Sequence, residues 1–166
     1  RLTFYVDHPL WIAGGVHVPV AKPPIRPKRH PLVLMTPHAR WSLHSTYKTS
    51  PILLRLQRGK PCVAIHPDTA KQRGIADGDT IKMFNELGEV LIMAKISPAT
   101  PPNAVVMEHG WEPLMYRNKR GHNLLVGDML NLLELSDGWG HLKFGTNWDG
   151  NQHAYETTVE LARASL

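Results

Sequence analysis

The sequence of 166 residues has a single cysteine, no long apolar run and no initiator methionine. The lone Cys62 excludes an internal disulfide and a cysteine-ligated metal cluster. It lies in the short apolar run 61–65, which predicts a buried structural thiol. No apolar stretch reaches the roughly 18 residues of a membrane-spanning helix, so no direct membrane insertion is expected. Because no start methionine or signal-peptide pattern opens the chain, we expect a piece of a longer polypeptide.

The charge balance is basic without being extreme. Charged residues make up 20% of the chain and hydrophobic residues 42%, which indicates a globular rather than a disordered protein. The net charge of +5 favours anionic ligands such as phosphates. Ten histidines add side chains suited to phosphate, metal or proton chemistry. One alternative is a basic barrel that binds single-stranded nucleic acid through its five tryptophans, although these are scattered rather than interleaved with basic residues.

Short apolar runs separated by turn signals predict a mainly β fold that forms a closed or partly closed barrel. The predicted strands are 1–6, 32–35, 62–65, 80–84, 89–96, 104–107 and 155–161. The predicted helices are 51–58, 67–73 and a short one within 123–135. Five prolines between positions 19 and 31 predict that residues 1–31 form an extended arm or a linker from a preceding domain. Residues 32–166 are then the barrel domain.

The stretch from Thr36 to Tyr47 follows the predicted strand 32–35 and is rich in hydrogen-bond donors. It carries two histidines, Arg40, Trp41 and several hydroxyl groups. Such donors suit phosphate groups and the edges of polar heterocycles, and tryptophan offers a stacking surface. The composition indicates a loop that binds an anion or a nucleotide. The alternative is a polar surface loop with a buried tryptophan, and composition leaves both open.

Other polar patterns favour structural roles. His38 and His44 are six residues apart with no third ligand nearby and no His-Glu-x-x-His motif, so no metal site is expected. Asp77-Gly78-Asp79 is predicted to be a tight turn rather than a calcium loop. His66, before a predicted helix, is expected to cap or pack. No spacing indicates a nucleophile with its base, so no catalytic residue is assigned.

An ordered set of short motifs resembles the molybdopterin-dinucleotide-binding C-terminal domain of the dimethyl sulfoxide reductase family. The opening 2–9 and the loop 36–45 are most similar to a subgroup that contains ethylbenzene dehydrogenase, dimethyl sulfide dehydrogenase, and selenate and chlorate reductases. The motifs, in chain order, are Leu54-Arg55-Leu56-Gln57-Arg58-Gly59, Ile65-His66-Pro67-Asp68-Thr69-Ala70, Arg73-Gly74-Ile75-Ala76-Asp77-Gly78-Asp79, Phe84-Asn85-Glu86-Leu87-Gly88, Glu108-His109-Gly110-Trp111-Glu112-Pro113 and Asn123-Leu124-Leu125.

The resemblance implies a six-stranded double-psi β-barrel that carries no catalytic residue of its own. It implies a domain of the catalytic subunit of a molybdenum oxidoreductase, which transfers electrons and an oxygen atom. The cofactor would be bis(molybdopterin guanine dinucleotide) with molybdenum, or tungsten in its place. The protein ligand of the metal and any iron–sulfur cluster are expected upstream of this chain, and the isolated domain is expected to be inactive.

The resemblance also implies which residues contact the cofactor. The loop 36–45 would lie along the pterin and pyrophosphate, His109 and Gly110 would approach from a second loop, and Asn123 would bind a guanine or pterin edge. Residues 152–155 would close the guanine pocket, although the family's Asp-Pro turn after Val126 is replaced here by Gly127-Asp128. The full set is Thr36, His38, Arg40, Trp41, Ser42, Leu43, His44, Ser45, His109, Gly110, Asn123, Gln152 and Tyr155.

The expected partners are the other domains of the same subunit, an iron–sulfur electron-transfer subunit and a haem subunit, with no nucleic acid. The resembling subgroup favours a periplasmic location, and a cytoplasmic one is the alternative. A third hypothesis is a barrel that binds protein, which would not need the donor cluster of loop 36–45.

Overall fold

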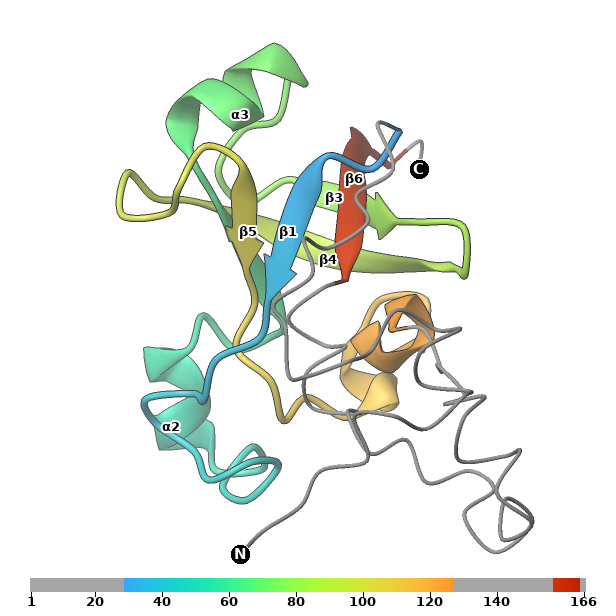
Figure 1. Ribbon diagram of the computed structural model, residues 1–166. Helices are drawn as coiled ribbons and strands as arrows, with labels where there is room; N and C mark the ends of the chain where they lie inside the picture. Colours follow the sequence, from blue (N-terminus) through green and yellow to red (C-terminus); the bar gives the residue numbers. More distant parts are fainter. Residues whose placement is uncertain (1–28, 127–156, 165–166) are drawn as a thin grey trace, which may run out of the picture. The chain divides into compact units, whose positions relative to one another are not determined.

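The computed structural model describes residues 29–126 and 157–164, in which six strands close into a barrel (Figure 1). The strand order around the barrel is β1-β5-β2-β4-β3-β6. The β1/β5 and β2/β4 pairs are parallel, and the other neighbours are antiparallel. The strands are β1 (Leu32–Met35), β2 (Cys62–Ile65), β3 (Thr80–Phe84), β4 (Glu89–Ile96), β5 (Ala104–Val106) and β6 (Thr158–Arg163). The predicted six-stranded, mainly β barrel is confirmed.

Short helices connect the strands, and of the four in the described residues three begin with proline, whose φ suits the first helical position. The helices are α2 (Pro51–Leu56), α3 (Pro67–Gln72), η1 (Pro113–Met115) and η2 (His122–Leu125). His66 caps α3 as predicted, because its Nδ1 accepts a hydrogen bond from the amide of Asp68 at 3.2 Å. None of the helices in the described ranges has the length and apolar character to cross a membrane.

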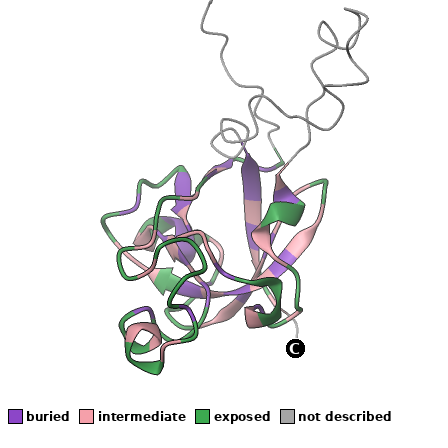
Figure 2. Cartoon of the chain, turned by 90° about the horizontal axis from the view of Figure 1, so that it is seen from below, coloured by how far each residue is buried: buried purple, intermediate pink, exposed green. Residues whose placement is uncertain are grey.

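The core lies inside the barrel, where alternate residues of β1 to β4 are buried, together with consecutive residues of β5 and β6 (Figure 2). The side chains that fill the interior include Leu32, Leu34, Val63, Ile65, Ile81, Met83, Val90, Ile92, Val105, Val159 and Leu161.

The structure corrects several predicted details. Helix α2 ends at Leu56 rather than residue 58, because Gln57 leaves the helical conformation and the amide of Gly59 turns back to the carbonyl of Leu54. Strand β6 begins at Thr158, whereas the sequence predicted a start at residue 155. The predicted strand 1–6 and the arm lie largely outside the described residues.

Cys62 is half-buried rather than buried, which corrects the prediction from the apolar run around it. Val63 and Ile65 take the inward positions of β2, so Cys62 lies on the outer side of the strand. Burial still raises the pKa of the Cys62 thiol, against the smaller opposing effect of Lys95. The thiol therefore stays protonated at neutral pH, as a structural cysteine does.

The turn at Asp77-Gly78-Asp79 is confirmed. Asp77 Oδ1 accepts a hydrogen bond from the amide of Ile96 at 2.8 Å, and Asp79 Oδ2 accepts one from the amide of Ala76 at 2.9 Å. The backbone bond from Ile96, and then the Arg58 guanidinium, lower the pKa of Asp77. Both carboxylates therefore have partners within the chain, as a structural turn requires.

We expect Glu160→Gln to lower the free energy of unfolding by about 1–2 kcal/mol. Arg73, after α3, donates to both carboxylate oxygens of Glu160 on β6, at 2.6 and 3.1 Å, and both side chains are mostly buried. Glu89→Gln is the matched control, because its pair with Lys82 is more exposed and 3.5 Å long, and exposed pairs contribute little. Urea denaturation of both variants measures the difference, and equal losses would contradict the assignment.

Candidate functional site

The candidate site lies where two loops leave the same end of neighbouring parallel strands. Strands β1 and β5 pair in register from Val33 with Ala104 to Met35 with Val106, and their arrowheads point the same way in Figure 1. The pairing continues past the strands, because the amide of His109 donates to the carbonyl of Pro37 at 3.1 Å. The loop 36–50 and the segment 107–112 therefore begin side by side.

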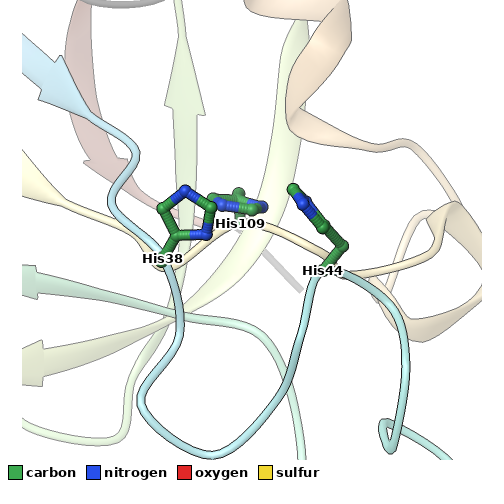
Figure 3. A group of neighbouring side chains, drawn as sticks. All are labelled: His38, His44 and His109. Atoms are coloured by element: carbon green, nitrogen blue, oxygen red, sulfur yellow. The ribbon is translucent and has the colours of Figure 1, made fainter.

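Three histidines meet at this point, and Figure 3 shows their rings gathered in one place. The ring centroids of His38 and His109 are 4.5 Å apart, those of His44 and His109 5.0 Å, and those of His38 and His44 5.3 Å. His38 and His44 are exposed, whereas His109 is half-buried. The prediction that the His38/His44 pair has no third ligand nearby was wrong, because the parallel pairing brings in His109 from far along the chain.

Gly110 allows the two loops to approach this closely. A Cβ atom at this position would lie 2.1 Å from the carbonyl oxygen of His44, which is far inside van der Waals contact. Gly110 also has φ of +88°, in the region that glycine adopts at least cost. His44 has a positive φ of 51°, so the contact consists of two tightly turned backbones.

The buried side chain of Lys48 connects the loop 36–50 to the segment 107–112. Its side chain is only 1% exposed, and its Nζ lies 3.8 Å from the centre of the Trp111 ring. Nζ also donates a hydrogen bond to Oε1 of the buried Gln57. Burial lowers the pKa of Lys48, and Glu108 acts in the opposite direction. Sequence reasoning missed this residue, because a lysine in a polar loop is ordinarily exposed.

The electrostatics of the cluster keep His109 neutral. Burial lowers its pKa below the ordinary value of 6.5, and His38, His44 and Lys48 lower it further. The pKa of His122 is lowered in the same way, mainly by burial and to a smaller extent by His109. A neutral imidazole can both donate and accept a hydrogen bond, which suits contact with a polar heterocycle.

The rest of the predicted loop is presented outward. Arg40 lies with its Cζ 5.0 Å from the centre of the Trp41 ring, and both residues are exposed, as are Leu43 and Ser45. Trp41 is 40% exposed, so the buried tryptophan of the alternative interpretation is wrong, whereas the loop itself does lie at the surface. Thr36 is partly exposed at the start of the loop.

Ser42 is the exception, because its Oγ is buried and has no hydrogen-bond partner within the described chain. A buried hydroxyl without a partner costs free energy, so such atoms ordinarily bind something. The hydroxyl can donate to a phosphate oxygen or to a ring nitrogen. The donor set of Ser42, Arg40 and the three imidazoles therefore fits an anionic ligand that also carries a polar heterocycle.

Asn123 lies at a separate pocket of about 410 Å³ that begins at Trp111. The segment 119–122 lines the same pocket with the exposed side chains of Lys119 and Arg120 and the half-buried His122. The pocket combines an apolar wall with cationic and amide groups, a mixture typical of ligand sites. Gln152 and Tyr155 lie outside the described residues.

Fold and site together define a small β-barrel domain that presents hydrogen-bond donors for a bound ligand at one end. Residues 32–134 match the family model described as "Molydopterin dinucleotide binding domain". The chain belongs to this family, and the family predicted from the motifs is confirmed. A molybdopterin-type cofactor is therefore the ligand class of the domain.

The relatives of the chain support the same family. The chain is 42% identical over 167 residues to the dimethylsulfide dehydrogenase subunit alpha of Rhodovulum sulfidophilum and 41% identical over 170 residues to the chlorate reductase subunit alpha of Ideonella dechloratans. Each alignment covers 99% of this chain but only 18% of the relative. The chain thus spans about a fifth of these alpha subunits, which belong to the predicted subgroup.

The barrel also matches a solved structure, acetylene hydratase from Pelobacter acetylenicus, with a TM-score of 0.66. The match covers 94% of this chain and 23% of the other, at 17% sequence identity. At this identity the likeness supports the fold alone.

We expect Gly110→Ala to be more destabilising than Gly78→Ala. Gly78 has a similar φ of +84° but open space around it, so its substitution costs only the backbone strain of about 1–3 kcal/mol. At position 110 the contact with His44 adds to that strain. Thermal or urea unfolding gives both values, and cross-peaks between the His44 and His109 rings should weaken only in Gly110→Ala. Equal losses in the two variants would exclude the close approach.

We expect His109 to titrate below 6.5 in the folded chain, and His38→Ala to raise its pKa towards that value. Because the unfolded chain then takes up this proton at higher pH than the folded one, this histidine's contribution to stability is present above pH 6.5 and is lost as the pH falls through its folded pKa. NMR titration of the ring protons measures the His109 pKa in both chains. A His109 pKa above 6.5 would contradict the burial and charge seen here.

Proposed function

We propose that this chain is the C-terminal cofactor-binding domain of the catalytic subunit of a molybdenum oxidoreductase, and that it holds bis(molybdopterin guanine dinucleotide). The observation that carries the proposal is the convergence of loop 36–45 with His109, shown by the clustered rings of His38, His44 and His109. The same loop holds the Ser42 hydroxyl, which has no hydrogen-bond partner among the described residues. Family membership supports the cofactor class. The alpha subunits among the relatives are named as a dehydrogenase and a reductase.

Loop 36–45 would bind the pterin and pyrophosphate part of the cofactor. Arg40 is exposed and free to turn from Trp41 toward a phosphate, where its planar fork can donate two bonds. His38, His44 and His109 supply donors and acceptors for ring nitrogens and oxygens, and Thr36, Ser42 and Ser45 supply hydroxyls. Trp41 and Leu43 offer exposed apolar surface beside these donors.

Gly110 would contribute by its lack of a side chain, since it lets the second loop reach the first. Asn123 would bind a base edge, with the neighbouring Lys119 and Arg120 drawing the phosphates toward its pocket. Gln152 and Tyr155 are proposed to complete the guanine end on the basis of the family resemblance.

The molybdenum of the bound cofactor, or tungsten in its place, would supply the electron and oxygen-atom transfer. The residues of this domain would bind and orient the cofactor. The metal's protein ligand and any iron–sulfur cluster would belong to the parts of the subunit upstream, and this domain alone would have no activity.

The family resemblance also supports proposals for the domain boundaries, the partners and the location of the protein. Residues 1–31 would form an arm from a preceding domain, and residues 32–166 the cofactor-binding barrel. The partners would be the remaining domains of the subunit, an iron–sulfur subunit and a haem subunit. A periplasmic location is proposed from the resemblance to the subgroup.

A barrel that only binds protein would also expose its loops, so the test measures the ligand directly. We expect isothermal titration of the chain with GDP to show binding that Arg40→Ala weakens about tenfold, the loss of one charge-assisted hydrogen bond. Arg55→Ala is the matched control, because Arg55 is another exposed arginine, on α2 and outside loop 36–45. Equal weakening in both variants, or in neither, would contradict the site.

The parent subunit provides a second readout. Arg40→Ala and His44→Ala should lower its molybdenum content after purification, measured by elemental analysis, while Arg55→Ala retains it. Full molybdenum content in both site variants would exclude the loop from cofactor retention.

A further inference from the structure

The three imidazoles at the loop junction also have the arrangement of a metal-ligand set. One ring nitrogen from each of His38, His44 and His109 lies within 4.8 Å of the others, and no carboxylate or thiol belongs to the group. We propose that, when the pterin dinucleotide is absent, these three histidines bind a divalent transition-metal ion of the zinc type. The inference rests on the proposed function only in naming the ligand that the metal would exclude.

The side chains can reach the required geometry without moving the barrel. A tetrahedral zinc ion with Zn–N bonds of about 2.0–2.1 Å holds its ligand nitrogens about 3.4 Å apart. His38 and His44 are exposed on one loop, so rotation of their side chains can close the remaining gap. The half-buried His109 is the ligand whose position is best defined, because its backbone amide donates a hydrogen bond to the carbonyl of Pro37. Figure 3 shows the rings of His38 and His44 on either side of the His109 ring.

Contacts around the cluster already keep the two loops close together. Gly110 packs against the backbone of His44, and Lys48 on the same loop contacts the ring of Trp111. Ligands that are held near one another before binding lose less conformational entropy when the ion arrives.

The chemistry of the ligands sets the class of ion. Three nitrogen ligands suit zinc, cobalt, nickel and copper, whereas magnesium and calcium prefer oxygen. Three protein ligands leave a coordination position open to solvent, as in zinc sites that hold water. The same imidazoles are the proposed cofactor donors, so the metal and the dinucleotide would exclude one another.

The first test is titration of the full chain, freed of metal by a chelator and carrying no affinity tag, with Zn²⁺ by calorimetry and Co²⁺ by visible absorption. We expect one Zn²⁺ per chain, Co²⁺ bands of tetrahedral nitrogen coordination, and a melting temperature that rises with Zn²⁺ concentration. Mg²⁺ should give no such rise. A folded chain that binds neither ion would overturn the proposal.

Variants locate the ion. His38→Ala and His44→Ala lie on an exposed loop and should each weaken Zn²⁺ binding at least about tenfold, and His109→Gln tests the half-buried ligand. His66→Ala is the matched control, since His66 caps α3 and stands outside the cluster. Near-ultraviolet circular dichroism confirms the fold of each variant. Zn²⁺ affinity that follows His66, or none of the three, would refute the assignment.

Competition separates this proposal from the proposed function. GDP binding should weaken in the presence of saturating Zn²⁺, and GDP in excess should bleach the Co²⁺ bands. Loss of metal binding with Arg40-dependent GDP binding intact would refute the metal site alone. Metal binding that follows the three histidines, with no GDP binding, would support the metal site and count against the cofactor loop.

Discussion

The parallel pairing of β1 with β5 is the constraint on which the site depends. Parallel neighbours send their following loops out at the same end, so a polar loop after β1 necessarily meets the segment after β5. The backbone bond from His109 to Pro37 extends that pairing beyond the strands. Without it, the donors of loop 36–45 would form a surface loop and His109 would belong to an unrelated turn.

Two further contacts turn this proximity into a defined geometry. Gly110 removes the side chain that would separate the loops, and Lys48 joins them beneath the surface through Trp111 and Gln57. The buried amine of Lys48, together with His38 and His44, also lowers the pKa of His109, because each positive charge disfavours the next. The site thus combines a neutral, half-buried His109 with the exposed cationic group of Arg40.

The same three histidines serve two proposals because both draw on neutral ring nitrogens. A pterin offers donors and acceptors around a polar ring, and a transition-metal ion accepts nitrogen lone pairs. The cofactor has the additional partners Ser42 and Arg40, whereas an ion needs only the imidazoles. In the absence of cofactor, an ion bound by His38, His44 and His109 would hold the two loops together.

Local signals in the sequence were sufficient to predict most of the strands, because short apolar runs bounded by turn residues depend only on neighbouring residues. They also predicted where α2 and α3 begin, because a proline at the first helical position acts on its own neighbours. The sequence also identified the family, because its motifs follow one another along the chain in the order that the family shows. Tertiary structure alone decided that His109 joins His38 and His44, that Lys48 is buried and that Cys62 faces outward. Those facts depend on which strands pair and which face turns inward, and neither is encoded by any short stretch of residues.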